Sequence, residues 1–106
     1  MFARRVSMQL KPNSVGEFTQ RIEKDILPLL RKQNGFRDEI TFVVPGGTEA
    51  FGISLWDKRE NAEAYNRETY PELTKILARV VEGTPKVETY EVANSTFHKI
   101  AAAAAA

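Results

Sequence analysis

Residues 50–56 of this chain read Ala-Phe-Gly-Ile-Ser-Leu-Trp. Alternate side chains of a strand point to opposite sides, so Phe51, Ile53 and Leu55 would share one face, and the small residues and Trp56 the other. Neither face carries a charged residue. Because both faces of such a strand are usually covered, the pattern predicts a central strand of a sheet.

Three further segments alternate apolar and polar side chains, which is the two-residue period of a strand. They are residues 2–10, 36–44 and 85–92. Arg4 alone interrupts the apolar face of the first segment. One face of the second segment is expected to carry Phe36, Ile40, Phe42 and Val44. The sequence Pro-Gly-Gly-Thr at residues 45–48 predicts a hairpin turn into the central strand, because glycine tolerates positive φ.

The segment after the first strand has the three- and four-residue apolar spacing of an amphipathic helix. Its apolar residues are Val15, Phe18, Ile22, Ile26, Leu29 and Leu30. Ser14 and Glu17 form a predicted capping box at its start. Pro28 cannot donate a backbone hydrogen bond, so we expect the helix to kink near residues 24–26.

A second helical segment follows the central strand. Asp57 and Glu60 predict a capping box at its beginning, Pro71 interrupts it, and Gly83 is expected to end it. The complete order is then β-α-β-β-α-β. This order is typical of the α+β, ferredoxin-like fold, in which two helices cover one face of a four-stranded antiparallel sheet.

The length of the chain fits one small domain, which we place at residues 1–100. The six alanines at residues 101–106 have no pattern that could pack against a core. We therefore expect them to form a tail that is not part of the fold.

Helices on one side cover only one face of the predicted sheet, yet the central strand is apolar on both faces. Leaving Phe51, Ile53 and Leu55 in water would forgo roughly 5–9 kcal/mol. We therefore predict a homodimer in which two copies pack sheet to sheet through this face. The alternative is that the extension at residues 93–100 folds over the same face.

The composition excludes several classes of partner. Fifteen basic and fourteen acidic residues give a net charge of +1, which lacks the basic surplus of a nucleic-acid-binding protein. Without cysteine, and with His98 as the single histidine, the chain lacks the ligands of an ordinary zinc site. There is no long apolar run and no signal-peptide pattern near Met1, so we expect a cytoplasmic protein without a membrane partner.

Several short motifs recur together in one known family. They are Pro12, Asn34-Gly35-Phe36, Ile53-Ser54-Leu55-Trp56 and Asp57-Lys58-Arg59-Glu60-Asn61-Ala62. The chain resembles, over residues 2–93, the dimeric α/β-barrel superfamily and, within it, the antibiotic-biosynthesis-monooxygenase-like domains. The resemblance implies a barrel made of two chains. It says less about activity, because this fold serves many functions.

The resemblance also implies a chemistry. Family members with oxygenase activity use no metal or flavin, because an electron-rich substrate supplies the electrons to O2. The expected function is therefore oxidation of a small aromatic or quinol compound without a cofactor. The alternative is a dimer that binds a ligand, or serves a stress or accessory role, without catalysis. The missing family residues described next favour this alternative.

The family's pocket lies between sheet and helices, where this chain would place Val6, Met8, Ser54 and Trp56. The small residues of the central strand would leave space beneath the second helix, or simply let helix and sheet approach closely. Trp56 would be either a flat pocket wall with a free indole N–H or a core residue.

On the second helix, Tyr65 stands where many members of the family carry a histidine, with Asn66 as a hydrogen-bonding neighbour. Haem-degrading relatives also carry an asparagine on the first strand, where this chain has Val6. Both departures argue against a haem role. Tyr70, at the helix break before Pro71, would line the mouth of a pocket or fill the kink.

Two adjacent arginines on the first strand, Arg4 and Arg5, must point to opposite faces of the sheet. One of them could hold a substrate carboxylate or enolate. The alternative is that both pair with acids on neighbouring strands, namely Asp38, Glu39, Glu88 or Glu91. His98 lies beyond the last strand and is interpreted as a surface imidazole.

Overall fold

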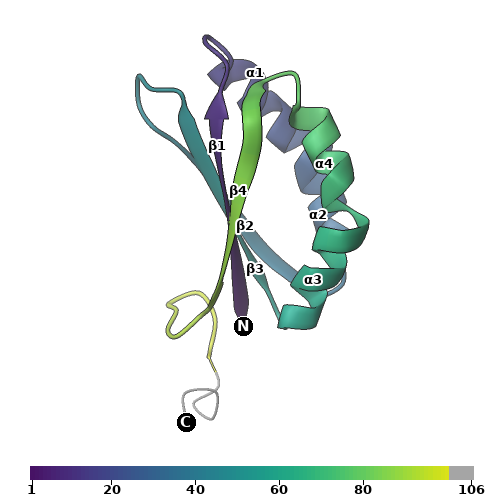
Figure 1. The fold of residues 1–106 in the computed structure, drawn as a ribbon. Helices are drawn as coiled ribbons and strands as arrows, with labels where there is room; N and C mark the ends of the chain where they lie inside the picture. Colours follow the sequence, from purple (N-terminus) through teal and green to yellow (C-terminus); the bar gives the residue numbers. More distant parts are fainter. Residues whose placement is uncertain (101–106) are drawn as a thin grey trace.

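A computed structural model describes residues 1–100; the predicted tail at 101–106 lies outside the described residues. Helices cover one face of a twisted antiparallel sheet, and the other face is open (Figure 1). The elements are β1 (Phe2–Leu10), α1 (Val15–Arg21), a π-helical turn η1 (Ile22–Ile26), α2 (Leu27–Arg31), β2 (Phe36–Val43), β3 (Glu49–Trp56), α3 (Arg59–Glu68), α4 (Tyr70–Leu77) and β4 (Val81–Glu91). This confirms the α+β, ferredoxin-like prediction.

The strand order is β2-β3-β1-β4, so β3 is central as its two apolar faces predicted. Ala50, Ser54 and Trp56 are buried on the helix side of β3, and Phe51 and Leu55 alternate with them on the open side. Cross-strand pairing aligns one polar row on the helix side: Arg4 of β1 is opposite Ser54, and Ser54 is opposite Glu39 of β2.

The first helical segment changes its winding where a kink was predicted. The five-residue π-helical turn η1 precedes Pro28, and the predicted kink at residues 24–26 falls within it. Proline lacks a backbone N–H, so the carbonyl one turn earlier loses its ordinary helical partner and the turn widens. Ile22 and Ile26 of this turn face the sheet and line the cavity described below.

Both predicted capping boxes are wrong. Ser14 does precede α1, but its hydroxyl lies 3.4 Å from the carbonyl oxygen of Pro12 and caps no helical amide. Glu17 instead accepts a hydrogen bond from Arg21 at 3.0 Å. The Asp57 carboxylate accepts one from Arg37 at 2.5 Å, and α3 begins two residues later. In both places an arginine attracts the carboxylate that the motif assigned to the backbone.

The second helical segment ends earlier, and the last strand begins earlier, than expected. Helix α4 ends at Leu77 rather than at Gly83, and β4 begins at Val81 rather than at residue 85. A bulge opposite Met8 explains how the strand includes Pro85: the register shifts there, and Gly83 has φ +67°. An edge strand tolerates a proline at such a bulge.

A second bulge, at Arg37, overturns the predicted face of β2. Phe36 pairs with Trp56 on the helix side, whereas Ile40 and Phe42 pair with residues of the open face of β3. The apolar residues predicted to share one face of this strand therefore do not do so, because the extra residue reverses the alternation after it. Val44, the last of them, lies just beyond the end of β2. The same shift turns Glu39 toward the helices.

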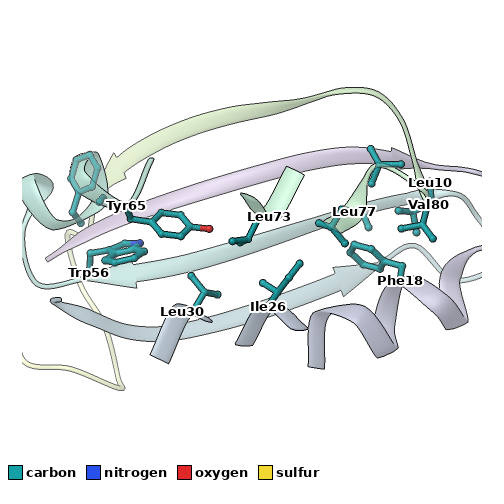
Figure 2. Packing of buried hydrophobic residues seen from close by; sticks show 13 residues of the cluster. Leu10, Phe18, Ile26, Leu30, Trp56, Tyr65, Leu73, Leu77 and Val80 are labelled. Carbon is teal, nitrogen blue, oxygen red and sulfur yellow. The ribbon is translucent and has the colours of Figure 1, made fainter. Parts of the chain in front are cut away.

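The core has two dense ends. Figure 2 shows Trp56 and Tyr65 together at one end, and Phe18 with Leu77 at the other. The hydroxyl of Tyr65 points along the sheet from the first end toward the second. Leu73 lies between the two ends, beside the space that forms the candidate site.

Within residues 1–100, no helix combines the length and the apolar character needed to cross a membrane.

Candidate functional site

A cavity of about 440 Å³ lies between the sheet and the helices. Its volume is within the range of small-molecule sites, roughly 300–1,000 Å³. Most of its wall is apolar and includes Val6, Met8, Ile22, Ile26, Leu73 and Leu77. Two charged and two phenolic side chains, one from each of four elements, also face it and give the cavity its chemistry: Arg4, Glu39, Tyr65 and Tyr70.

Two of the small residues of β3, Gly52 and Ser54, line this space, which is one of the two possibilities that the sequence left open. Ala50 is buried and does not line it. The pocket wall predicted at Val6, Met8 and Ser54 is therefore present. Trp56, which was predicted as part of the same wall, does not line the cavity.

Arg4 is a buried cation without a carboxylate partner. Only 3% of its surface is exposed, and within residues 1–100 no acid lies at ion-pair distance from it. Its guanidinium donates a hydrogen bond to Asn66 Oδ1 at 2.6 Å. Its central carbon lies 4.1 Å from the ring centroid of Tyr70 and 5.2 Å from that of Tyr65. The alternative prediction, in which Arg4 pairs with an acid of a neighbouring strand, is therefore wrong.

The surroundings of Arg4 compensate its charge only in part. Burial lowers the pKa of Arg4, although a guanidinium stays protonated in proteins. Two aromatic faces contribute about 0.5–2 kcal/mol each, whereas an unpaired buried charge costs several kcal/mol. A ligand oxygen with negative charge would complete this environment.

Two tyrosine hydroxyls serve as donors beside Arg4. Burial raises the pKa of Tyr65 above its ordinary value, and the nearby Arg4 offsets only part of that effect. Burial raises the pKa of Tyr70 as well, again partly offset by Arg4. Both phenols therefore keep their protons at neutral pH and can donate hydrogen bonds to a ligand.

Glu39 supplies a carboxyl group across the cavity from Arg4. One strand separates the two residues, which places their Cα atoms about 10 Å apart. The Thr41 hydroxyl lies 2.7 and 2.9 Å from the two carboxyl oxygens, but its single proton satisfies one at a time. Burial raises the pKa of Glu39, and the Thr41 hydrogen bond opposes that rise. One carboxyl oxygen is thus left to exchange a proton with a ligand.

Glu39 was predicted only as an ion-pair partner of the arginines on β1, and not as a residue of the site. The signal was present in the alternation, because a strand that turns Ile40 and Phe42 to the open face turns Glu39 and Thr41 to the helix face. What concealed it was the bulge at Arg37, which no local pattern marked.

Trp56 supports the site from behind. Its ring has no exposed surface, and its indole N–H donates to Ser54 Oγ at 2.9 Å. The expectation of a free indole N–H is therefore wrong, because Ser54 lies two residues away on the same face of β3 and its hydroxyl oxygen accepts the hydrogen bond. The ring packs against Phe36 and Tyr65, with centroids 5.5 and 4.9 Å apart.

The remaining candidates divide between the two faces of the sheet. Asn66 binds Arg4 but does not line the inner cavity. Arg5 lies on the open face, where it pairs with Glu88 at 3.4 Å and covers the ring of Phe51 at 4.5 Å. His98 binds the Asp38 carboxylate, so its imidazole is an anchor of the C-terminal extension rather than a free surface group.

No group of three or more metal-ligating side chains lies close enough together within residues 1–100 to hold a metal ion.

Comparison with known proteins finds similarity in structure only. No family model matches the chain, and no curated protein matches its sequence. A monooxygenase from Streptomyces coelicolor in complex with nanaomycin D superposes with a TM-score of 0.75 at 14% identity, over 92% of each chain. SnoaB, a cofactor-independent oxygenase from Streptomyces nogalater, superposes with a TM-score of 0.73 at 9% identity, over 90% of this chain and 95% of that one.

A third similar structure is a protein of unknown function from Nitrosomonas europaea. It is 18% identical, with a TM-score of 0.74 over 95% of this chain and 94% of its own. Other structures with the same fold are named antibiotic biosynthesis monooxygenases. At these identities the likeness is one of fold, and the chain has the fold of the antibiotic-biosynthesis-monooxygenase-like proteins, as its sequence motifs predicted.

Proposed function

We propose that this protein is a cytoplasmic enzyme that binds a small electron-rich phenol or quinol in the inner cavity and oxidises it with O2 without a cofactor. The observation that carries the proposal is Arg4, a buried cation that faces an apolar cavity and has no acidic partner within residues 1–100. Two solved structures of the same fold, named as a monooxygenase and as a cofactor-independent oxygenase, support it.

Each polar residue of the cavity has a role in this proposal. Arg4 holds the ligand oxygen that carries negative charge, in the phenolate or enolate form. Tyr65 and Tyr70, which stay protonated, donate hydrogen bonds that orient the same oxygen. Glu39 accepts the proton that the ligand must lose before it can give electrons to O2. The raised pKa of Glu39 makes its carboxylate a better base than an exposed one.

The proposed reaction converts a CH2 group beside a phenolic ring into a carbonyl. Glu39 removes one proton, and the resulting carbanion, delocalised onto the oxygen held by Arg4, transfers electrons to O2 and forms a C–O bond. Glu39 returns its proton to the peroxide, and the hydroperoxide then loses water, which contains the second oxygen atom and both hydrogens of the carbon. The substrate loses four electrons and O2 gains four, so no external reductant is needed.

The second candidate function is ligand binding without catalysis. It is favoured by Tyr65, which stands where many similar domains carry a histidine, and by the inert Val6 on β1. This candidate uses the same cavity and the same anchoring by Arg4. It differs in that Glu39 would stabilise the bound ligand without moving a proton.

We also propose that the protein acts as a homodimer through the open face of the sheet. Ile40 and Phe42 are 44% and 41% exposed there, and Phe42 stacks on Phe51 with centroids 4.7 Å apart. The C-terminal extension binds this side through His98, at the end of the face where β1 begins (Figure 1). Since the extension leaves Ile40 and Phe42 exposed, a second copy is the cover that we favour.

Oxygen uptake with 1,8-dihydroxyanthrone tests the proposed catalysis. The protein should raise uptake at least tenfold above buffer, with one O2 consumed per anthrone and one ¹⁸O atom in the product from ¹⁸O2. Glu39→Gln and Arg4→Gln should each lower the rate at least tenfold, whereas Glu49→Gln, at an exposed position on β3, should not. Saturable binding of the anthrone without faster uptake would instead support the non-catalytic alternative.

A further inference from the structure

A second hollow, of about 650 Å³, lies outside the inner cavity and between α3 and β4. Its walls come from β1, α3 and β4, and Val87 and Thr89 of β4 form its far side. Arg4 lines both spaces, whereas Tyr65 and Tyr70 line only the inner cavity and Asn66 only the outer hollow. The guanidinium of Arg4 therefore forms the boundary between the two.

From this juxtaposition we propose that the outer hollow is a subsite for a carboxylate on a ligand whose ring occupies the inner cavity. The ligand class is a hydroxylated aromatic carboxylic acid, with its phenolic ring between sheet and helices and its carboxylate on the far side of Arg4. This inference rests on the proposed aromatic ligand of the inner cavity and adds the substituent that selects among such ligands.

The hydrogen-bonding capacity of Arg4 supports a carboxylate partner. A guanidinium carries five N–H donors in a plane, and the hydrogen bond to Asn66 at 2.6 Å uses one of them. A carboxylate accepts two parallel hydrogen bonds from such a fork, which a single phenolic oxygen cannot do. Arg4 lines the outer hollow as well as the inner cavity, so a carboxylate in the outer hollow can reach guanidinium N–H groups that a phenolic oxygen in the inner cavity leaves free.

The other charges of the hollow add to the attraction. Arg59 and Glu63 line it, so with Arg4 its lining carries two cations and one anion. Arg59 also lies 3.9 Å from Glu91, but both side chains are more than half exposed, at 58% and 73%. An exposed pair at this distance is weak and leaves Arg59 free to turn toward a bound anion.

A matched pair of probes, 1-naphthol and 1-hydroxy-2-naphthoate, tests the subsite by isothermal titration calorimetry. Both carry the ring and hydroxyl that the inner cavity should accept, and only the second carries a carboxylate. The wild-type protein should bind the naphthoate at least tenfold more tightly than the naphthol. Arg59→Gln should reduce that preference at least threefold and leave the affinity for naphthol unchanged.

Two further variants separate a local subsite from general charge. Arg67→Gln removes an exposed arginine from the same helix and should change neither affinity. Glu63→Gln removes the anion of the hollow and should raise the naphthoate affinity about twofold or more. Equal effects of Arg59→Gln and Arg67→Gln would overturn the subsite, because the preference would then reflect net charge alone.

The probes also distinguish failure of the subsite from failure of the proposed function. If both probes bind with equal affinity, the carboxylate subsite is wrong while an aromatic ligand in the inner cavity stands. If neither probe binds, the aromatic ligand itself is wrong, and the subsite is refuted with it.

Discussion

Gly52 lies directly against the carboxyl group of Glu39: a Cβ atom on residue 52 would be 2.8 Å from Glu39 Oε2. No real side chain approaches so closely, so the absence of a side chain at Gly52 is what lets Glu39 fold inward over β3. The other atoms near that position, in Ile40 and Thr41, are at least 3.8 Å away. Gly52 thus acts as a positioning residue for the proposed base.

Gly52→Ala should therefore move Glu39 without unfolding the protein. The group that must shift is the far end of a flexible side chain, so we expect less than about 1.5 kcal/mol of destabilisation, as for a small overpacking change. Anthrone oxidation should fall at least tenfold because the carboxyl no longer faces the ligand.

Gly16→Ala is the matched control, since nothing lies within 4 Å of its added Cβ on α1. It should leave oxidation unchanged and stabilise the fold by about 0.5–1 kcal/mol. Unchanged oxidation in Gly52→Ala would argue against a role for Glu39.

Glu39→Gln should change how stability depends on pH. Burial raises the pKa of Glu39 in the folded state, so the folded protein binds this proton more tightly than the unfolded chain does. The stability that Glu39 contributes to the folded state is therefore fully present below the ordinary glutamate pKa. It is lost as the pH rises through the raised pKa of the folded state. Glu39→Gln removes that loss, so the free energy of unfolding should rise relative to wild type between pH 4 and pH 7. Urea unfolding at both pH values measures it.

The control for this comparison is Glu60→Gln, which changes an exposed carboxylate at the start of α3. The free energy of unfolding of Glu60→Gln, relative to wild type, should change less between pH 4 and pH 7 than that of Glu39→Gln does. If Glu39→Gln changes the free energy of unfolding by the same amount at pH 4 and pH 7, then burial does not shift the pKa of Glu39.

Trp56→Phe should affect folding more than ligand binding. The change removes the hydrogen bond to Ser54 and leaves unfilled volume behind Tyr65, which together should cost about 1–3 kcal/mol. Because Trp56 does not line the inner cavity, the dissociation constant for 1-naphthol should stay within about threefold of wild type. Thermal unfolding and calorimetry measure the two quantities. A tenfold loss of affinity for 1-naphthol at unchanged stability would show instead that Trp56 contacts the ligand.

Leu55→Arg tests the proposed dimer. In a sheet-to-sheet dimer the new charge would be buried without a partner, so the dimer should dissociate or fail to fold, a loss of several kcal/mol. Val87→Arg is the control, because Val87 lies on the helix side of β4 and is 38% exposed. Light scattering at micromolar concentration should give a dimer for wild type and Val87→Arg, and a monomer for Leu55→Arg. A monomeric wild-type protein would refute the dimer.

The fold was predictable because its signals are local. Alternation within residues 50–56 identified the central strand, and Pro28 marked the place of the π-helical turn. The errors arose where one inserted residue or one distant partner decided the outcome. The bulge at Arg37 reversed the faces of β2, and the attraction of Asp57 to Arg37 removed the predicted cap of α3.

The candidate site was predictable only in part, for the same reason. Arg4, Ser54, Tyr65 and Tyr70 were identified and do face the cavity. The bond that fixes Arg4 joins it to Asn66, 62 residues away, and no periodicity in the sequence reports such a pair. Likewise, the position of Trp56 behind the wall depends on how its ring packs with Phe36 and Tyr65.

The most direct test of the account is whether the inner cavity holds an aromatic ligand, measured as the binding of 1-naphthol before and after the cavity is filled. Val6→Phe places a larger apolar side chain into the space that Val6 lines. The account predicts saturable binding of one naphthol per chain to the wild-type protein, and at least a tenfold loss of affinity in Val6→Phe with an unfolding temperature no lower than that of wild type. Absence of saturable binding to wild type, or equal binding to both proteins, would contradict it.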